Sequence, residues 1–245
     1  MKENELIFGI RAIIEAIQAG KEIDKVIIKK DLQSELSREL FAALKEKPQI
    51  QLQRVPVERI NRYTRKNHQG AIAFVSQTVY QKTEDIVPFL FEQGKNPFIV
   101  ILDGVTDVRN FGAIARTCEC AGVDAIVIPS RGGALVNADA IKTSAGALHN
   151  IPVCKEKSLL DTVKFLKNSG VKIVAATEKG NKLYTDACLA DPVAVVMGAE
   201  DTGVSPEILR QCDEMVKIPI NGNISSLNVS VAAGVLIYET IRQRG

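Results

Sequence analysis

The feature that most constrains this sequence is a series of short, uninterrupted apolar runs in its second half. The first run is PFIVIL at residues 97–102, and similar runs occupy residues 125–128, 172–176, 193–197 and 215–218. A strand reads as a continuous apolar run when both faces of its sheet are covered. Helical patterns lie between and after these runs, at residues 109–121, 137–147, 158–169, 205–212 and 228–243. The pattern predicts an α/β fold with a mostly parallel sheet and crossover helices.

The first part of the chain alternates helix and strand patterns on a smaller scale. Helices are predicted over residues 10–19, 34–47 and 57–63, and short strands over residues 25–29, 50–55 and 71–75. We therefore predict a small α/β domain over residues 1–76 and a larger domain over residues 96–245. Residues 77–95, with Pro88 and Gly94, are interpreted as a linker in which the pattern allows a helix over residues 84–91.

Composition sets the broad class. The chain has 245 residues, of which 46% are hydrophobic, so it can bury a sizeable core. It has no apolar run of the roughly 20 residues that a membrane helix needs, and its start lacks the pattern of a signal peptide. The five cysteines are scattered and odd in number, which favours buried free thiols. His68 and His149 are too far apart to suggest a metal site. We expect a cytoplasmic protein without a metal and without a membrane partner.

Positive charge is concentrated near the N-terminus, although the whole chain has a net charge of only +2. Residues 1–80 hold 14 lysines and arginines against 10 acidic residues. Within them, Glu58 alone opposes a cluster of basic residues, namely Arg54, Arg59, Arg62, Arg65 and Lys66. Such a cluster is either a contact surface for RNA phosphates or an ordinary solvated face.

Familiar nucleotide-binding signatures are missing from the sequence. It contains no G-x-G-x-x-G after a strand, no G-x-x-x-x-G-K-[ST] and no G-x-S-x-G. Three other segments each follow a predicted strand, where open α/β sheets bind their ligands: residues 103–117, 197–205 and 218–234. Each alone has a structural explanation, such as a glycine turn or a helix cap. Their joint occurrence at successive strand ends favours a functional site.

These three segments resemble the sequence motifs of the SpoU (TrmH-type) branch of the SPOUT RNA methyltransferases. The resemblance runs from residue 98 to the C-terminus, and the stretch SLNVS at residues 226–230 followed by Ala232 and Ala233 is especially specific. The first part of the chain, with FGI at residues 8–10 and NHQG at residues 67–70, resembles the RlmB-type members. In these a small, ribosomal-protein-like RNA-binding domain precedes the catalytic domain.

The resemblance implies a fold and a cofactor. It implies a C-terminal trefoil knot involving the segments around residues 197–205 and 218–229, a rare exception to unknotted folds. It also implies a homodimer that completes the active site, and bent S-adenosylmethionine bound without a metal. The positions that would contact the cofactor are Thr177, Gly198, Ile218 and Leu227.

The resemblance also implies a chemistry. Arg116 would help to activate a ribose 2′-hydroxyl, and the other active-site positions are Asn110, Glu200, Ser226 and Asn228. Arginine side chains stay protonated in proteins. Our hypothesis is therefore that Arg116 remains charged, grips a phosphate and stabilises the developing alkoxide. The RNA-binding candidates are Arg54, Arg62, Arg65, Lys66 and His68.

The predicted activity is 2′-O-methylation of a guanosine in structured RNA, with 23S ribosomal RNA favoured by the N-terminal domain. Two alternatives stay open: the same reaction on a transfer-RNA guanosine, and a non-catalytic RNA-binding or ribosome-assembly factor. A binding protein would not need Asn110, Arg116, Glu200, Ser226 and Asn228 together, which argues for an enzyme.

Overall fold

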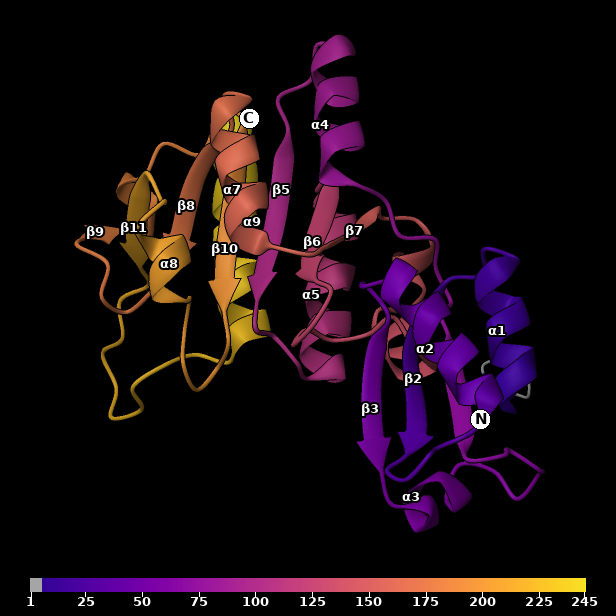
Figure 1. Cartoon of the computed structure of the whole chain (residues 1–245). Helices are drawn as coiled ribbons and strands as arrows, with labels where there is room; N and C mark the ends of the chain where they lie inside the picture. The colour runs from indigo at the N-terminus through magenta and orange to yellow at the C-terminus, as the bar shows by residue number, and fades with distance from the viewer. Residues whose placement is uncertain (1–5) are drawn as a thin grey trace. The chain divides into compact units, whose positions relative to one another are not determined.

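The computed structural model describes residues 6–245 (Figure 1). Their contacts form two compact units, one ending at Val79 and the other running from Tyr80 to Gly245. No helix among the described residues is long and apolar enough to cross a bilayer.

The first unit is a four-stranded sheet with three helices. Its strands are ordered β1 (Leu6–Phe8), β4 (Ala71–Val75), β2 (Ile23–Lys29) and β3 (Gln51–Val55). Strand β4 is antiparallel to both of its neighbours, whereas β2 and β3 are parallel. Helices α1 (Ile10–Gln18), α2 (Glu35–Glu46) and α3 (Val57–Asn61) complete the unit, and a capping box at Ser34 and Ser37 begins α2. The predicted small α/β domain is therefore present, with β1 as an added strand.

The second unit contains a seven-stranded parallel sheet. The order is β7 (Val153–Glu156), β6 (Ala125–Pro129), β5 (Phe98–Asp103), β10 (Val193–Gly198), β8 (Lys172–Ala176), β11 (Glu214–Lys217) and β9 (Lys182–Leu183). Every pair of neighbouring strands in it is parallel. Figure 1 shows β10 between β5 and β8. Because all strands run the same way, the loops at their carboxyl ends gather at one edge of the sheet.

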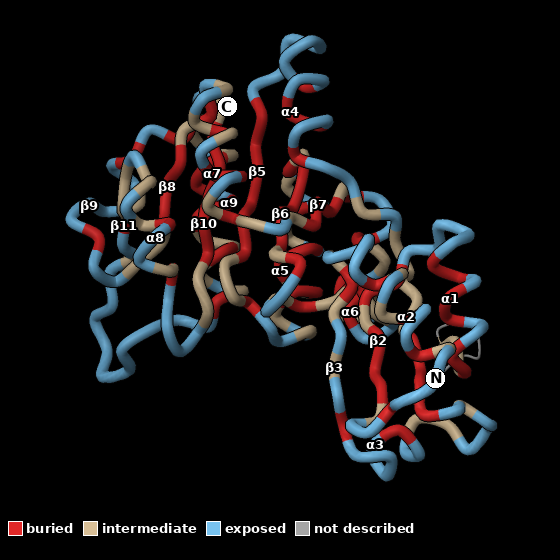
Figure 2. The backbone as a smooth tube through the Cα atoms, in the orientation of Figure 1, coloured by how far each residue is buried: buried red, intermediate tan, exposed pale blue. Residues whose placement is uncertain are grey.

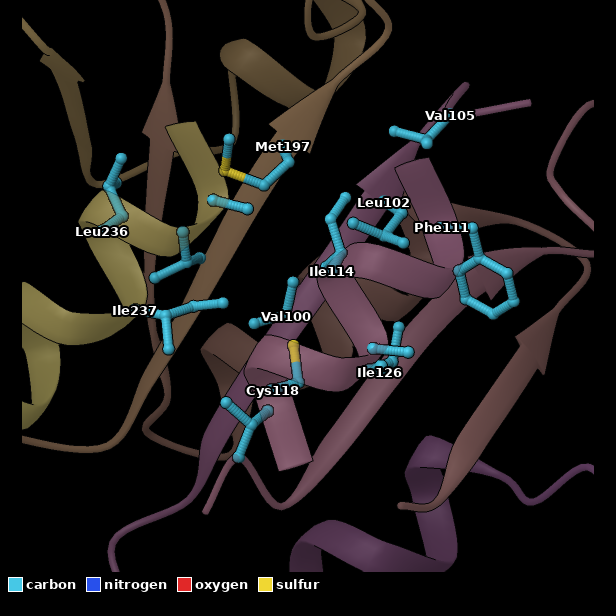
Figure 3. Packing of buried hydrophobic residues seen from close by; sticks show 14 of the residues in the cluster. Val100, Leu102, Val105, Phe111, Ile114, Cys118, Ile126, Met197, Leu236 and Ile237 are labelled. Carbon is cyan, nitrogen blue, oxygen red and sulfur yellow. The ribbon is translucent and has the colours of Figure 1, made fainter. Parts of the chain in front are cut away.

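Both faces of this sheet are covered, as the continuous apolar runs predict. One face packs on α5 (Val108–Cys120) and α9 (Val229–Arg244), and Figure 3 shows Phe111, Ile114, Leu236 and Ile237 in this core. The other face packs on α4 (Thr83–Glu92), α7 (Leu159–Asn168) and α8 (Pro206–Leu209). Figure 2 shows the central strands as buried. A short helix, α6 (Ala138–Thr143), and two single turns, η2 (Ala147–His149) and η3 (Tyr184–Asp186), complete the unit.

Residues 77–95 differ from the predicted linker, because α4 is part of the second unit. Ile86, Val87 and Leu90 are buried in its core. The backbone N–H and hydroxyl of Thr83 each donate to Glu156 Oε1 over 2.9 Å, which fixes the start of the helix. A single amphipathic helix with an internal proline gives no sign of which domain its apolar face will join.

The cysteines are free, but not all are buried as we expected. Cys118 and Cys154 are buried, whereas Cys120 and Cys188 are exposed. Cys120 follows Cys118 by two positions, so on helix α5 the two side chains point in different directions. Burial raises the pKa of the Cys154 thiol to about 12 and so keeps it protonated.

The last helix is held at its C-terminal end by Arg244. Its guanidinium donates to the carbonyl oxygens of Asn96, Pro97 and Asp191 over 2.9, 3.2 and 2.8 Å. Its Cζ lies 5.1 Å from the centre of the Phe98 ring. One side chain thereby joins α9 to the starts of β5 and β10.

Replacement of Arg244 by alanine should lower the stability of the second unit. The loss of several charge-assisted bonds predicts a decrease of about 2 kcal/mol, or about 4–8 °C in Tm, measured by calorimetry. Arg244→Lys should recover little of the lost stability, because a compact ammonium group cannot reach several carbonyl groups at once. Arg210→Ala, at an exposed arginine next to α8, is the control. Equal Tm changes in the two variants would contradict this role.

Candidate active site

A pocket of about 320 Å³ lies beyond the carboxyl ends of β8, β10 and β11. Its walls come from three loops, at residues 176–179, 197–204 and 216–227, and from the first turn of α9. Most of the last loop, residues 219–228, is exposed, as Figure 2 shows. All four predicted cofactor-contacting residues line this pocket, namely Thr177, Gly198, Ile218 and Leu227. Parallel strands have therefore brought together residues that are 50 positions apart in sequence.

Gly198 has no room for a side chain. A Cβ atom at this position would lie 2.1 Å from the carbonyl carbon of Gly203 and from the nitrogen of Val204. The intervening loop folds back on itself, and the N–H of Gly203 donates to the carbonyl of Ala199 over 2.9 Å. Glycine is thus required here for close backbone approach, rather than for a positive φ angle. The turn places Glu200 at its tip, on the wall of the pocket.

Three polar side chains from the three predicted motifs meet beside this pocket. Glu200 Oε1 accepts hydrogen bonds from Asn228 Nδ2 over 2.6 Å and from Asn110 Nδ2 over 3.1 Å. Asn228 Nδ2 also donates to Asn110 Oδ1 over 3.0 Å. Asn110 lies in the first turn of α5, and Asn228 caps α9, so both asparagines stand on helix ends. We call Asn110, Glu200 and Asn228 the polar triad.

The other two predicted active-site residues make no hydrogen bond to the triad. Ser226 lines the pocket. Arg116 is exposed on α5, and it neither lines the pocket nor makes a hydrogen bond or ion pair within residues 6–245. Six positions separate it from Asn110, which puts the two side chains on different sides of the helix. The chain by itself therefore does not bring Arg116 to the pocket.

The structure adds residues to the site that we did not predict. Asp103 ends β5, and its Oδ2 accepts a hydrogen bond from the N–H of Ser205 over 2.6 Å, which joins the first two motifs. Glu178, Lys179 and Asp201 line the pocket. Asp103 and Asp201 belong to the singled-out segments, but nothing in the sequence distinguishes them from ordinary loop residues. Glu178 and Lys179 follow the predicted strand at residues 172–176. Their position after a strand end is the sequence feature that could have pointed to them.

The predicted RNA-binding residues occupy the first unit, and several of them have internal contacts. Arg54 stacks on Phe41, with Cζ 5.0 Å from the ring centre, and Lys66 Nζ lies 5.2 Å from the centre of the Phe8 ring. Arg62 and Arg65 are exposed. Burial and, to a smaller extent, the nearby Arg59 guanidinium lower the pKa of Lys25 in the same unit.

His68 makes contacts within its own turn. Its Nδ1 accepts from the N–H of Gly70 over 3.0 Å, and its Nε2 lies 2.8 Å from Asn61 Oδ1. These two contacts assign the neutral ring with the proton on Nε2. The side chain therefore holds the turn together, and a direct RNA contact through a ring nitrogen would break one of these bonds.

No group of three or more His, Cys, Asp or Glu side chains within the described chain could hold a metal ion. The second unit has a parallel sheet that is covered on both faces and a pocket that loops form at the carboxyl ends of its strands. These features define it as an α/β ligand-binding domain. The polar triad lies at the wall of this pocket through Glu200.

Comparison with known proteins supplies the family. Residues 97–238 match the SpoU rRNA methylase family, and residues 6–81 match the RNA 2′-O ribose methyltransferase substrate-binding family. The chain therefore belongs to the SpoU rRNA methylase family of RNA methyltransferases. One relative, from Staphylococcus saprophyticus, is named as a TrmH family tRNA/rRNA methyltransferase and is 33% identical over 99% of this chain and 97% of its own.

Two further similarities agree with this assignment. The 23S rRNA (guanosine-2′-O-)-methyltransferase RlmB of Vibrio parahaemolyticus is 34% identical over 98% of each chain. The fold is similar to that of the SpoU methyltransferase AviRb from Streptomyces viridochromogenes, solved with the cofactor AdoMet. That similarity has a TM-score of 0.61 and 24% identity, and it covers 98% of this chain and 90% of AviRb.

Substitution of Gly198 by alanine should close part of the pocket. The added Cβ would overlap the backbone of Gly203 and Val204, so the loop must move. We expect the affinity for S-adenosylmethionine, measured by isothermal titration calorimetry, to fall at least about tenfold, or 1.4 kcal/mol. Gly222→Ala, in a loop position where a Cβ would meet nothing within 4 Å, is the matched control. Unchanged affinity in Gly198→Ala would show that the close contact does not shape the pocket.

Proposed function

We propose that this protein transfers the methyl group of S-adenosylmethionine to the ribose 2′-hydroxyl of a guanosine in 23S ribosomal RNA. The observation that carries the proposal is the polar triad, which links the three family motifs beside the pocket. The RlmB relative and the match to a substrate-binding family in the first unit support ribosomal RNA as the substrate.

The pocket has the features that the cofactor requires. Its volume lies within the range of small-molecule sites. Ile218, Leu227 and Val216 supply apolar surface for the adenine ring, and backbone groups near Gly198 supply donors and acceptors. The acidic Asp201 suits a positively charged sulfonium ligand.

When bound, S-adenosylmethionine supplies an electrophilic methyl group. The methyl group would pass from the sulfonium to the ribose 2′-oxygen, which would leave a neutral thioether, and the hydroxyl proton would pass to solvent water. Asn110 and Asn228 hold Glu200 through Oε1, which leaves Oε2 to orient the hydroxyl or the guanidinium of Arg116. Arg116 stays charged and stabilises the developing alkoxide. Most of the rate then comes from in-line positioning.

In this proposal the protein is a homodimer, and Arg116 of one copy reaches the pocket of the other copy. Val231 and Tyr238 lie seven residues apart on one face of α9 and are 52% and 54% exposed, and Ile224 before the helix is 77% exposed. A second copy of the chain would cover this apolar surface. Helix α5 packs on α9 near Gly234 and Thr117, so the exposed Arg116 lies close to the same surface. It then serves the pocket of the second copy.

Mixed dimers should reveal whether Arg116 acts across the interface. Arg116→Ala and Glu200→Gln should each lose most of the activity when alone. Random mixing of the two chains should restore about a quarter of the wild-type rate, because half of the dimers are mixed and each has one intact site. The rate of methyl transfer from tritiated cofactor measures this recovery. If both residues serve the same subunit, no mixture will recover.

We also infer that the C-terminal segment is knotted. In support, the N–H of Thr177 donates to the carbonyl of Val216 over 2.9 Å, and Gly180 lies against the Val216 backbone. The loop after β8 is thus packed tightly on β11, just before residues 218–229 would pass through the region of residues 197–205. The small side chain of Ala232, in the first turn of α9, lines the same pocket as residues 197–204.

The first unit, in the same proposal, is the ribosomal-protein-like domain that binds the RNA. Arg62 lines an open hollow together with Pro56, Glu58, Arg59 and Tyr63. Arg62 and Arg65 are both exposed, and they supply phosphate contacts. Arg54 lies over the Phe41 ring and Lys66 over the Phe8 ring, and these contacts hold the two positive charges in place.

The RNA target is tested with RNA from cells that lack this protein. Purified protein and tritiated S-adenosylmethionine should label one guanosine of 23S ribosomal RNA. The label should resist alkaline hydrolysis, because a methylated 2′-oxygen cannot attack the adjacent phosphate. Glu200→Gln, expected to bind the cofactor but not to label RNA, is the control. Labelling of transfer RNA alone would favour that substrate instead, and cofactor binding without labelling of either RNA would contradict an enzyme.

A further inference from the structure

A second hollow lies between helix α6 and the first turn of α5, the turn that carries Asn110 of the polar triad. Its walls hold both signs of charge: Asp107, Arg109, Asp139 and Lys142. Arg109, Asp139 and Lys142 are exposed, and within residues 6–245 none of their side chains makes an ion pair or hydrogen bond. Arg109 directly precedes Asn110 of the triad. We call this hollow the α5–α6 groove.

The groove is firmly built, although the side chains of Arg109, Asp139 and Lys142 are unpaired within residues 6–245. Asp107 Oδ1 accepts from the N–H groups of Arg109 and Asn110 over 2.8 and 2.9 Å, which fixes the start of α5. Gly112 brings α6 against α5, because a Cβ there would lie 2.7 Å from Thr143 Cβ and 2.9 Å from the Ala140 carbonyl oxygen. The position of Asp139 and Lys142 relative to Asn110 is therefore set by backbone packing.

A tight turn ends α6 at the same place. Ala145 adopts a φ of +52°, which is uncommon for a residue with a side chain, and Gly146 follows at +90°. Such backbone is retained where the surrounding structure demands it, and often near functional sites. Here the turn stops α6 directly after Lys142 and Thr143 have reached the groove.

We propose that the α5–α6 groove binds the base of the target nucleotide and selects guanine. The inference rests on the proposed function, since it identifies how that same site chooses its substrate. Asp139 accepts hydrogen bonds from N1–H and from the N2 amino group of guanine. Lys142, one turn further along α6, donates to O6.

This assignment follows from the order of donors and acceptors on the base. Along its Watson–Crick edge guanine presents two donors, N2 and N1, followed by the acceptor O6. A carboxylate followed by an ammonium group is the complement of that order. Adenine presents an acceptor at N1 and a donor at N6, so it would place like groups together. Unpaired bases in RNA are commonly read through hydrogen bonds on this edge.

Arg109 completes the arrangement from the α5 side. It lines the groove and directly precedes Asn110 of the triad in sequence, and its side chain has five donors in a planar fork. It grips the phosphate of the target nucleotide while the base occupies the groove and the ribose lies at Asn110 and Glu200.

The test compares guanosine with inosine, which lacks only the N2 amino group. Two synthetic RNA hairpins carry one or the other at the nucleotide mapped in the labelling experiment. Wild-type protein should methylate the inosine hairpin with a kcat/KM about tenfold lower. Asp139→Asn should lower kcat/KM on the guanosine hairpin by about 10- to 100-fold, and the same variant should show almost no difference between the two hairpins.

Lys142→Gln gives an independent reading, because O6 is present in both bases. It should lower kcat/KM by the same factor on both hairpins. Asp161→Asn, which also removes a carboxylate from the first turn of a helix but on the opposite face of the sheet, should leave both values unchanged.

The outcomes separate this inference from the proposed function. If wild-type protein methylates the guanosine hairpin but Asp139→Asn keeps the full wild-type preference for guanosine over inosine, the groove does not read the base and the inference fails alone. If wild-type protein methylates neither the hairpin nor 23S ribosomal RNA, the proposed function itself fails. Cofactor affinity, measured by calorimetry, should be the same in all variants, since the groove and the cofactor pocket share no lining residue.

Discussion

The site depends on one close backbone contact at the end of the central strand β10. Gly198 lies against Gly203 and Val204 with no space for a Cβ atom, so the loop between them folds back as a tight turn. That turn places Glu200 where amide groups from α5 and α9 both reach it. The loop after Gly198 therefore forms part of the pocket wall and also carries Glu200 of the polar triad, so the same turn shapes both.

Asn228 connects the stability of the last helix with the chemistry of the site. Its Oδ1 accepts from the N–H of Ser230 and so caps α9, while its Nδ2 donates to Glu200 and Asn110. At the other end of the helix, Arg244 joins α9 to the starts of β5 and β10. Between its two ends α9 packs on the sheet through Leu236 and Ile237. A helix held in this way gives the triad a fixed geometry, which methyl transfer needs for in-line approach.

Much of this could be predicted from residues alone. The apolar runs predicted a parallel sheet covered on both faces, because only such strands lack polar alternation. The family resemblance implied that Thr177, Gly198, Ile218 and Leu227 contact the cofactor, and the structure places all four on the wall of one pocket. Residues 77–95 were less informative, since an amphipathic helix does not show which core it will enter. The contacts of His68 were not predictable either: its ring nitrogens bind the backbone of Gly70 and the side chain of Asn61.

By itself, then, the sequence determined the α/β class, the family and the segments that form the site, because apolar periodicity and motif spacing are local properties of the chain. Tertiary structure alone decided which side chains meet. Asn110, Glu200 and Asn228 come into contact across 90 and 28 positions, whereas Arg116, six residues from Asn110, turns away on the same helix. Strand order and helix rotation set these distances, and neither quantity is encoded in any short stretch of sequence.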